Sequence, residues 1–175
     1  QIAAIEGGDL ANMSTTQIAA LTNPQVAALT TAQVYALTGS QVAALTVGQI
    51  GALTTAQVAA IGGDIASMTI PQIVALDTAQ VAALTPSQIQ SMGSAPIVAL
   101  ETADVAALTT AQVAAIRSTG LMEMSTEQIV ALTTGQIQAL TTSQIQALTS
   151  EQVEAMETAD VAALTTAQIV AMQVG

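Results

Sequence analysis

The sequence predicts an all-α solenoid built from short, one-helix repeats of eight residues, and three observations lead to this fold class. An octapeptide pattern of polar and apolar residues recurs along nearly all of the 175 residues. Each repeat carries its own signal for the start of a helix. The repeat length also suits neither one continuous helix nor a strand, so the helices are expected to be short and separate.

One repeat, Thr54 to Ile61 (TTAQVAAI), shows how the residues specify a helix. We number its positions 1 to 8, so that Thr54 is position 1 and Gln57 is position 4. A Thr followed three residues later by Gln is a capping-box pattern, in which the Thr hydroxyl accepts from the Gln backbone N–H and the Gln side chain accepts from the Thr N–H. The pattern predicts a helix that begins at Thr54 and a turn before the next repeat.

The period of eight argues against longer elements. Residues advance by about 100° around a helix, so an apolar stripe on positions 5 and 8 would drift by about 80° per repeat in one continuous helix. In a strand, positions 5 and 8 would point to opposite faces. An isolated helix shorter than about 12 residues is marginal in water, so each repeat must be stabilised by stacking on its neighbours.

The regular repeats fall into three blocks of six, and an irregular unit precedes each block. The irregular units are 6–13 (EGGDLANM), 62–68 (GGDIASM) and 117–124 (RSTGLMEM). They define a super-repeat of 55 to 56 residues, with blocks at about 6–61, 62–116 and 117–172. Because this length suits one domain and the repeats can only fold against one another, we predict a single domain over residues 1–175.

Each position in the repeat has an expected place. Position 5 is Ile or Val and position 8 is Leu, Ile or Met in the regular repeats, so these residues are predicted to form the core. Position 7 is Ala except at Ser91, which indicates close approach of a neighbouring helix, and the variable position 6, occupied once by Tyr35, is expected at an exposed edge. The Gln residues at position 4, such as Gln33, Gln41 and Gln49, are predicted to stack into a ladder along the array.

The two ends of the sequence carry parts of one repeat. The chain opens with QIAAI, positions 4 to 8, and closes with QVG, positions 1 to 3, so the two parts joined tail to head spell one octad. We therefore predict that units continue end to end, either as one longer polypeptide or as subunits that stack head to tail into a filament. The predicted contact residues are Gln1, Ile2, Ile5, Met172 and Val174. The alternative is an arbitrary chain boundary.

The composition argues against several functions. A net charge of −11 with one basic residue, Arg117, disfavours nucleic acid and anionic membrane surfaces as partners. No apolar run approaches about 18 residues, so no membrane insertion is expected. The chain has no Cys, no His, no P-loop and no dinucleotide-binding fingerprint, so we expect no enzyme activity and no cofactor.

Two groups of acidic residues are candidates for catalysis or for metal binding. Glu101 with Asp104, and Glu157 with Asp160, have the spacing of paired carboxylates, but they occupy positions 1 and 4 and are more simply interpreted as helix N-terminal acids favoured by the helix dipole. The second group follows paired glycines.

Asp9 in GGD at 7–9 and Asp64 in GGD at 62–64 resemble fragments of the calcium-binding repeats of secreted bacterial proteins. Calcium binding at Asp9 or Asp64 is one interpretation, although one Asp per turn supplies few oxygen ligands. The other interpretation is a bend in the superhelix that the glycines permit.

Two resemblances to known families follow from the repeat itself. The stretches LTTAQVAAI at 108–116 and TIPQIVAL at 69–76 resemble the first helix of the DNA-reading repeats of TAL effectors. The second helix, the base-reading pair and the basic residues of those repeats are missing, so this resemblance does not imply DNA binding. Over the whole chain, tandem LTTAQV and LTTAQI octads resemble tracts in very large, acidic bacterial surface and adhesin-like proteins, often exported by type I secretion. That resemblance implies a structural or spacer role at the cell surface or outside the cell.

The expected function is therefore structural: an extracellular rod or filament segment whose partner is another copy of itself. The alternative is an adhesin-type binding surface, in which one Thr-Thr pair per repeat lines a flat face and binds ice or a polysaccharide. The interruptions at Gly62, Gly93 and Arg117 count against a regular lattice of this kind.

Overall fold

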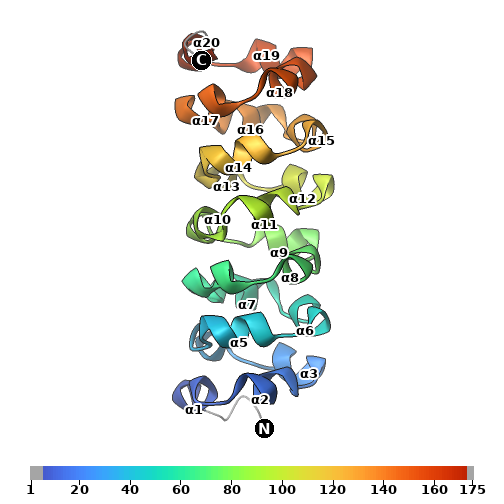
Figure 1. Ribbon diagram of the computed structural model, residues 1–175, viewed down its shortest axis with the longest axis vertical. Helices are drawn as coiled ribbons and strands as arrows, with labels where there is room; N and C mark the ends of the chain where they lie inside the picture. The colour runs from blue at the N-terminus through green and yellow to red at the C-terminus, as the bar shows by residue number, and fades with distance from the viewer. Residues whose placement is uncertain (1–5, 173–175) are drawn as a thin grey trace.

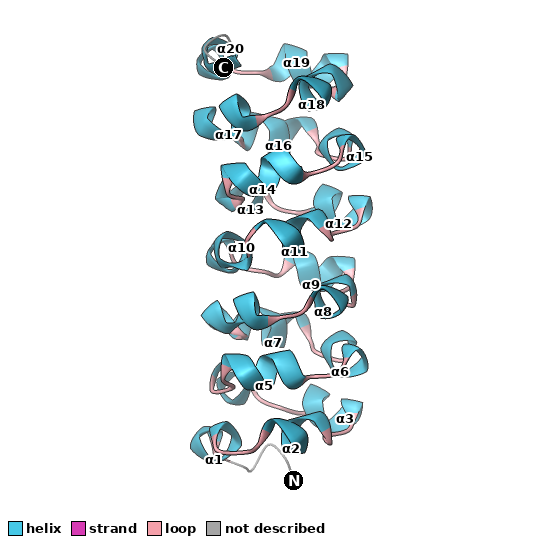
Figure 2. Ribbon diagram, in the orientation of Figure 1, coloured by secondary structure: helices cyan, strands magenta, loops and turns pink. Residues whose placement is uncertain are grey.

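The protein folds into an elongated solenoid of short helices. The computed structural model describes residues 6–172, and every regular element within that range is a helix (Figure 2). The first helix, α1 (Gly7–Ala11), and the last, α20 (Thr166–Met172), lie at opposite ends of the long axis (Figure 1). The all-α solenoid of one-helix repeats predicted from the sequence is confirmed.

Three helices make one turn, because each helix packs on the helix three elements further along the chain. This stacking forms three rows that run along the rod. Row one contains α1, α4 (Thr31–Tyr35), α7 (Thr55–Ala60), α9 (Thr78–Ala82), α12 (Thr102–Ala107), α15 (Thr126–Val130) and α18 (Ser150–Ala155). Row two contains α2 (Thr15–Ala19), α5 (Gly39–Ala44), the 3₁₀ helix η2 (Gly62–Ser67), α10 (Pro86–Met92), α13 (Thr110–Ala115), α16 (Thr134–Ala139) and α19 (Thr158–Ala163). Row three contains α3 (Asn23–Ala27), α6 (Val47–Gly51), α8 (Ile70–Val74), α11 (Ser94–Val98), α14 (Ser118–Glu123), α17 (Thr142–Ala147) and α20.

The capping boxes form as the sequence predicts. Thr54 has extended torsions (φ −74°, ψ 159°), and its Oγ1 accepts from the backbone N–H of Gln57 at 3.3 Å. Gln57 Oε1 accepts in return from the backbone N–H of Thr54 at 2.7 Å. In many repeats position 8 is also extended, as at Leu45 (φ −60°, ψ 137°). Two consecutive extended residues therefore turn the chain from one row to the next.

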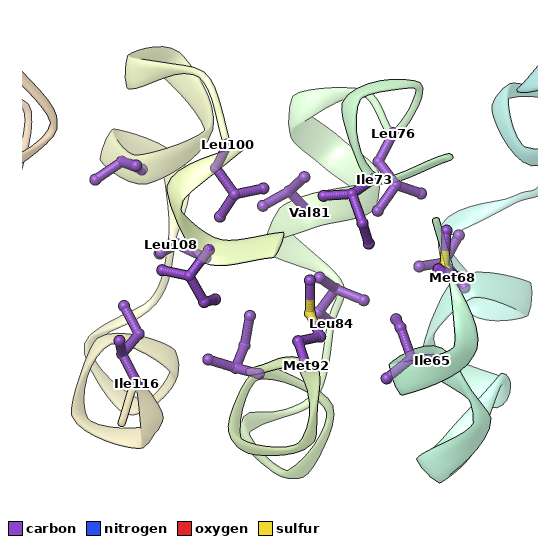
Figure 3. Close-up of a cluster of buried hydrophobic side chains, with 14 of the residues drawn as sticks. Ile65, Met68, Ile73, Leu76, Val81, Leu84, Met92, Leu100, Leu108 and Ile116 are labelled. Atoms are coloured by element: carbon purple, nitrogen blue, oxygen red, sulfur yellow. The ribbon is translucent and has the colours of Figure 1, made fainter. Parts of the chain in front are cut away.

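Positions 5 and 8 form the core between the three rows. Val58 and Ile61, for example, are 0% and 1% exposed. Figure 3 shows such side chains from several helices pointing into the space that the helices enclose. Full burial of one aliphatic side chain stabilises by about 1.5–3 kcal/mol before chain entropy is subtracted, which helices this short require.

Positions 7 and 6 of the repeat also lie where the sequence predicts. Position 7 alanines are partly buried against the core, among them Ala60, Ala75 and Ala115. Position 6 is exposed along much of the rod, and Tyr35 at this position is 72% exposed.

The three irregular units lie in three different rows: α1 in row one, η2 in row two and α14 in row three. A super-repeat contains seven units and a turn contains three, so each irregular unit is shifted by one row relative to the previous one. Gly62 has a φ of +66° and connects α7 to η2 without an extended residue. Non-Gly residues rarely adopt this torsion, which accounts for the glycine at this position. Gly7 and Gly8 do not have a positive φ, and a bend of the superhelix at the paired glycines stays a prediction.

None of the helices in the described part of the chain is long and apolar enough to cross a membrane.

Candidate functional site: the contacts between layers and the two ends

Successive layers of the solenoid are joined by the Gln side chain at position 4. In α13, Gln112 Oε1 accepts from the backbone N–H of Thr109 at 2.6 Å. The Nε2 group of Gln112 donates to the backbone carbonyls of Val81 at 3.0 Å and Leu84 at 2.7 Å, in the layer below. One amide therefore caps the start of its own helix and the end of α9.

This arrangement satisfies groups that a short helix cannot satisfy itself. The last carbonyls of any helix lack intrahelical donors, and in repeats of eight residues such groups recur at every turn. Gln112 is only 1% exposed, so its amide replaces water as the donor to these carbonyls. Twelve glutamines whose acceptors lie within residues 6–172 act in this way, and we refer to them as the interlayer glutamines: Gln41, Gln49, Gln57, Gln72, Gln80, Gln88, Gln112, Gln128, Gln136, Gln144, Gln152 and Gln168.

The predicted ladder of Gln33, Gln41 and Gln49 is wrong. These residues belong to α4, α5 and α6, which lie in three different rows and therefore do not stack. The Nε2 groups of Gln41 and Gln49 donate to backbone carbonyls 28 to 31 residues earlier, among them those of Leu10 and Ile18. The sequence reveals the recurrence of Gln but not its partner, which depends on the number of helices per turn.

The interlayer bond is missing where Asp replaces Gln at position 4. Asp104 and Asp160 lie in the first turns of α12 and α19, as predicted, and are only 8% and 4% exposed. A carboxylate has no proton to donate, and no side chain among the described residues donates to the carbonyl of Leu76, which Gln at residue 104 would reach. Asp160 instead accepts from Thr134 Oγ1 at 2.8 Å.

The C-terminal end of the rod leaves core side chains uncovered. Val161 and Ile169, both at position 5, are 44% and 45% exposed, whereas Val113 at the same position inside the rod is 0% exposed. A depression at this end is lined by Ile145, Gln146, Leu148, Ser150, Val153, Glu154, Ala171 and Met172. Met172, a predicted end-to-end contact residue, lines this depression, and its contact with a further unit stays a prediction. The other predicted contact residues, Gln1, Ile2, Ile5 and Val174, lie outside the described residues.

The N-terminal end of the rod presents amide donors. Gln17 and Gln25 keep their capping boxes, with Oε1 accepting from the backbone N–H groups of Ser14 and Thr22 at 2.8 Å. Both residues are exposed, and their Nε2 groups have no hydrogen-bond partner among the described residues.

The two candidate calcium ligands lie apart. Asp9 is exposed in α1 of row one, and Asp64 belongs to η2 of row two. Among residues 6–172, no group of three or more His, Cys, Asp or Glu side chains is placed to hold a metal ion. Calcium binding at Asp9 or Asp64 stays a prediction.

Row one carries a continuous line of hydroxyl groups at position 2, which the sequence analysis also missed. We refer to it as the row-one hydroxyl line: Thr31, Thr55, Thr78, Thr102, Thr126 and Ser150. Position 2 of the other two rows is interrupted by residues such as Gly39, Val47 and Pro86.

Next to the row-one hydroxyl line, a shallow depression is lined by Thr102, Thr126, Glu127, Val130, Ala131 and Ala155. The backbone N–H of Glu127 and then the Ser125 hydroxyl lower the pKa of the Glu127 carboxyl by hydrogen bonding to its charged form. This carboxyl is fully exposed.

Comparison with known families identifies the repeat itself. A family model described as the ALTTAQ repeat matches residues 2–39, 62–94, 97–134 and 130–157, which together make up more than half of the chain. No curated protein matches the sequence at a significant level.

Proposed function

This chain belongs to the ALTTAQ repeat family, and from that premise we propose that it is a structural rod segment that lengthens by end-to-end stacking. The observation that supports the proposal is the repetition of one contact along the rod: a core of positions 5 and 8 closed by an interlayer glutamine. Because each layer contacts the next in the same way, a further unit with the same residues can stack on the rod and lengthen it.

The proposal includes a position outside a bacterial cell. It is supported by the resemblance of the tandem octads to tracts in large surface and adhesin-like proteins. The net charge of −11 keeps such a rod soluble, and the absence of Cys suits any redox compartment. Labelling of intact cells of the source organism with an antibody to the repeat tests the location; labelling only after lysis contradicts it.

The proposed function assigns no catalysis and no cofactor to the chain. Nucleic acid is not a proposed partner, because a surface of this charge repels the phosphate backbone.

Sedimentation velocity and negative-stain electron microscopy test the stacking. The expected result is a population of rods of constant width whose mean length rises with protein concentration. Particles of one chain length at every concentration would contradict the proposed assembly.

A binding surface is a second candidate function, and the row-one hydroxyl line favours it. The hydroxyls of Thr31, Thr55, Thr78 and Thr102 form no hydrogen bond within the described residues, so they can bind ordered water at an ice surface or the hydroxyls of a polysaccharide. The neighbouring depression adds an exposed carboxylate, that of Glu127, and the apolar side chain of Val130.

Thermal hysteresis and binding to insoluble polysaccharide test this second function. The triple variant Thr55→Val, Thr78→Val and Thr102→Val keeps side-chain shape and removes three hydroxyls from row one. Loss of binding in this variant is expected, while Thr15→Val, Thr110→Val and Thr166→Val in the other rows should bind normally. Absence of binding by the unmodified chain rejects this function.

A further inference from the structure

We propose that two copies of this chain pair side by side through row three, with α14 of each copy antiparallel to α14 of the other. This pairing goes beyond the proposed stacking and does not depend on it, because it uses the flank of the rod and helices in its middle layers.

Row three carries an apolar patch on its outer surface. Val74, Val98 and Met122 occupy position 6 of α8, α11 and α14 in three successive layers (Figure 1), and they are 51%, 37% and 47% exposed. Ile70 lies one helical turn before Val74 in α8 and is 40% exposed. We refer to Ile70, Val74, Val98 and Met122 as the row-three patch.

The row-three patch is confined to the middle of the rod. Position 6 of row three is Gly51 in α6, below the patch, and Gln146 in α17, above it. In row one, position 6 is Ala in the successive helices α7, α9 and α12. Exposed apolar residues that stand alone are ordinary, whereas a line of them in adjoining layers is typical of a surface that binds a partner.

The single basic residue of the chain lies beside the row-three patch. Arg117 is the N-cap of α14, Glu123 is the last residue of that helix, and both are exposed. Arg117 makes no capping hydrogen bond and no ion pair with an acidic side chain among residues 6–172. The helix dipole favours acids at the start of a helix and bases at its end, which is the reverse of this arrangement. The stability of α14 itself therefore explains neither charge.

A second copy of the chain supplies the charges that complement these two. When two α14 helices lie antiparallel, the start of each faces the end of the other, so Arg117 of each copy faces Glu123 of the second copy. A two-fold axis parallel to the rod makes this ion pair twice, as in any interface that uses one surface on both subunits. With a net charge of −11 and no other basic residue, any other pair of faces brings together surfaces that lack this complementarity.

One register accommodates both the charges and the apolar side chains. Arg117 is position 1 of its unit and Glu123 is position 7, so their pairing places the two-fold axis at the level of position 4. Position 6 of one copy then faces position 2 of the other in each layer. In α8 this register sets Val74 against Ile70 of the second copy, so apolar side chains meet on both sides of the axis.

The other two layers of the row-three patch have small residues at position 2. These are Ser94 in α11 and Ser118 in α14, and both are partly buried. They leave room on the facing copy for the larger side chains of Val98 and Met122. The same register therefore covers the whole patch, and burial of its side chains drives the pairing while the ion pairs select the orientation.

Exchange of the two charges tests the orientation. Arg117→Glu sets a carboxylate against Glu123 of the second copy, and we expect it to raise the dissociation constant of the pair at least about tenfold, since like charges across an interface repel. The helix start should tolerate this change, because Glu is already the N-cap of α12 and α19. The double variant Arg117→Glu with Glu123→Arg restores opposite charges and should pair as the unmodified chain does. Arg117→Glu mixed with Glu123→Arg should form mixed pairs, although each alone repels itself.

The apolar contact has its own matched pair of variants. Val98→Gln places an amide in the centre of the row-three patch and should weaken the pairing. Val130→Gln makes the same change at position 6 of row one, where Val130 is 41% exposed, and should leave the pairing unchanged. Circular dichroism melting verifies the fold of every variant.

Small-angle X-ray scattering over a concentration series provides the readout. Side-by-side pairing doubles the mass per unit length of the rod, whereas end-to-end stacking leaves it unchanged, so the two proposals fail separately. We expect the doubled value for the unmodified chain, and the value of one rod at every concentration would overturn the pairing. Equal pairing by Arg117→Glu, no recovery in the charge-exchanged double variant, or equal weakening by Val130→Gln would reject the α14 interface.

Discussion

The neighbouring helices α12 and α13 differ in one respect that separates the two contributions to layer packing. Their sequences, TADVAA and TAQVAA, are the same except at position 4. Val105 and Val113 at position 5 are both 0% exposed, so the core packs alike in the two helices. Gln112, however, is bonded to the layer below, and Asp104 is not. Core packing and interlayer hydrogen bonding are therefore separable. The residue at position 4 alone determines whether the interlayer hydrogen bond forms.

The largest effect is expected from placing a carboxylate at position 4 of α13, where α12 already has one in Asp104. Gln112→Glu keeps the capping box with Thr109 but removes the donor to Val81 and Leu84. It also buries a carboxylate against carbonyl oxygens, so we expect a loss of about 3 kcal/mol in the free energy of unfolding. Urea denaturation followed by circular dichroism measures this loss.

The matched control for that change is Gln90→Glu. Gln90 is exposed at position 6 and makes no hydrogen bond to another layer. We expect a change within about 0.5 kcal/mol. Equal losses in the two variants would mean that the added charge, and not the interlayer bond, destabilises the rod.

Truncation of the core should affect α12 and α13 equally. Val105→Ala and Val113→Ala each remove two buried methyl groups and leave a small cavity, so each should cost about 2 kcal/mol. Thermal denaturation of both variants under one condition measures the difference. A clearly larger loss in α13 would show that the interlayer glutamine also tightens the core beneath it, and the two contributions would then not be separable.

The reverse substitution makes α12 resemble α13. Asp104→Gln supplies a donor for the carbonyls at the end of α8, including that of Leu76, so we expect a gain of about 1 kcal/mol, the net value of a typical hydrogen bond. Asp104→Asn is the control, because its amide is one methylene shorter and should fall short of the carbonyls. A gain of the same size in both variants would point to loss of the charge as the cause.

The smallest expected effect concerns an exposed acid, Glu127 in α15, in contrast to the buried Asp104. Hydrogen bonds to its charged form lower the pKa of Glu127 from its ordinary value of 4.5. The stability that Glu127 contributes is therefore present above pH 4.5 and is lost as the pH falls below that value through the folded-state pKa. NMR titration of the Glu127 carboxyl should show the lowered pKa. Glu127→Gln should remove its part of the acid dependence, and a pKa at or above 4.5 would contradict this account.

The sequence predicted the parts of the fold that depend on near neighbours. Thr54 and Gln57 are three residues apart, so the capping box and the start of α7 could be inferred from them alone. The core positions followed from the period. The number of helices per turn depends on the torsions of the extended residues at positions 8 and 1, such as Leu45 and Thr46, and small differences there change which helices meet.

The candidate site was less predictable because its partners are distant in the sequence. The acceptors of Gln112 lie 28 to 31 residues earlier, so no local pattern connects them. The same holds for the row-one hydroxyl line, which becomes visible only when every third repeat is read together.

Hydrogen exchange of glutamine side chains tests the central claim most directly, because the amide of each interlayer glutamine is held between two layers. By NMR, the Nε2 protons of Gln112 should exchange with solvent much more slowly than those of exposed Gln90, since exchange at Gln112 requires the layers to open. Exchange at equal rates would contradict the account, because it would mean that the position 4 amides do not join the layers in solution.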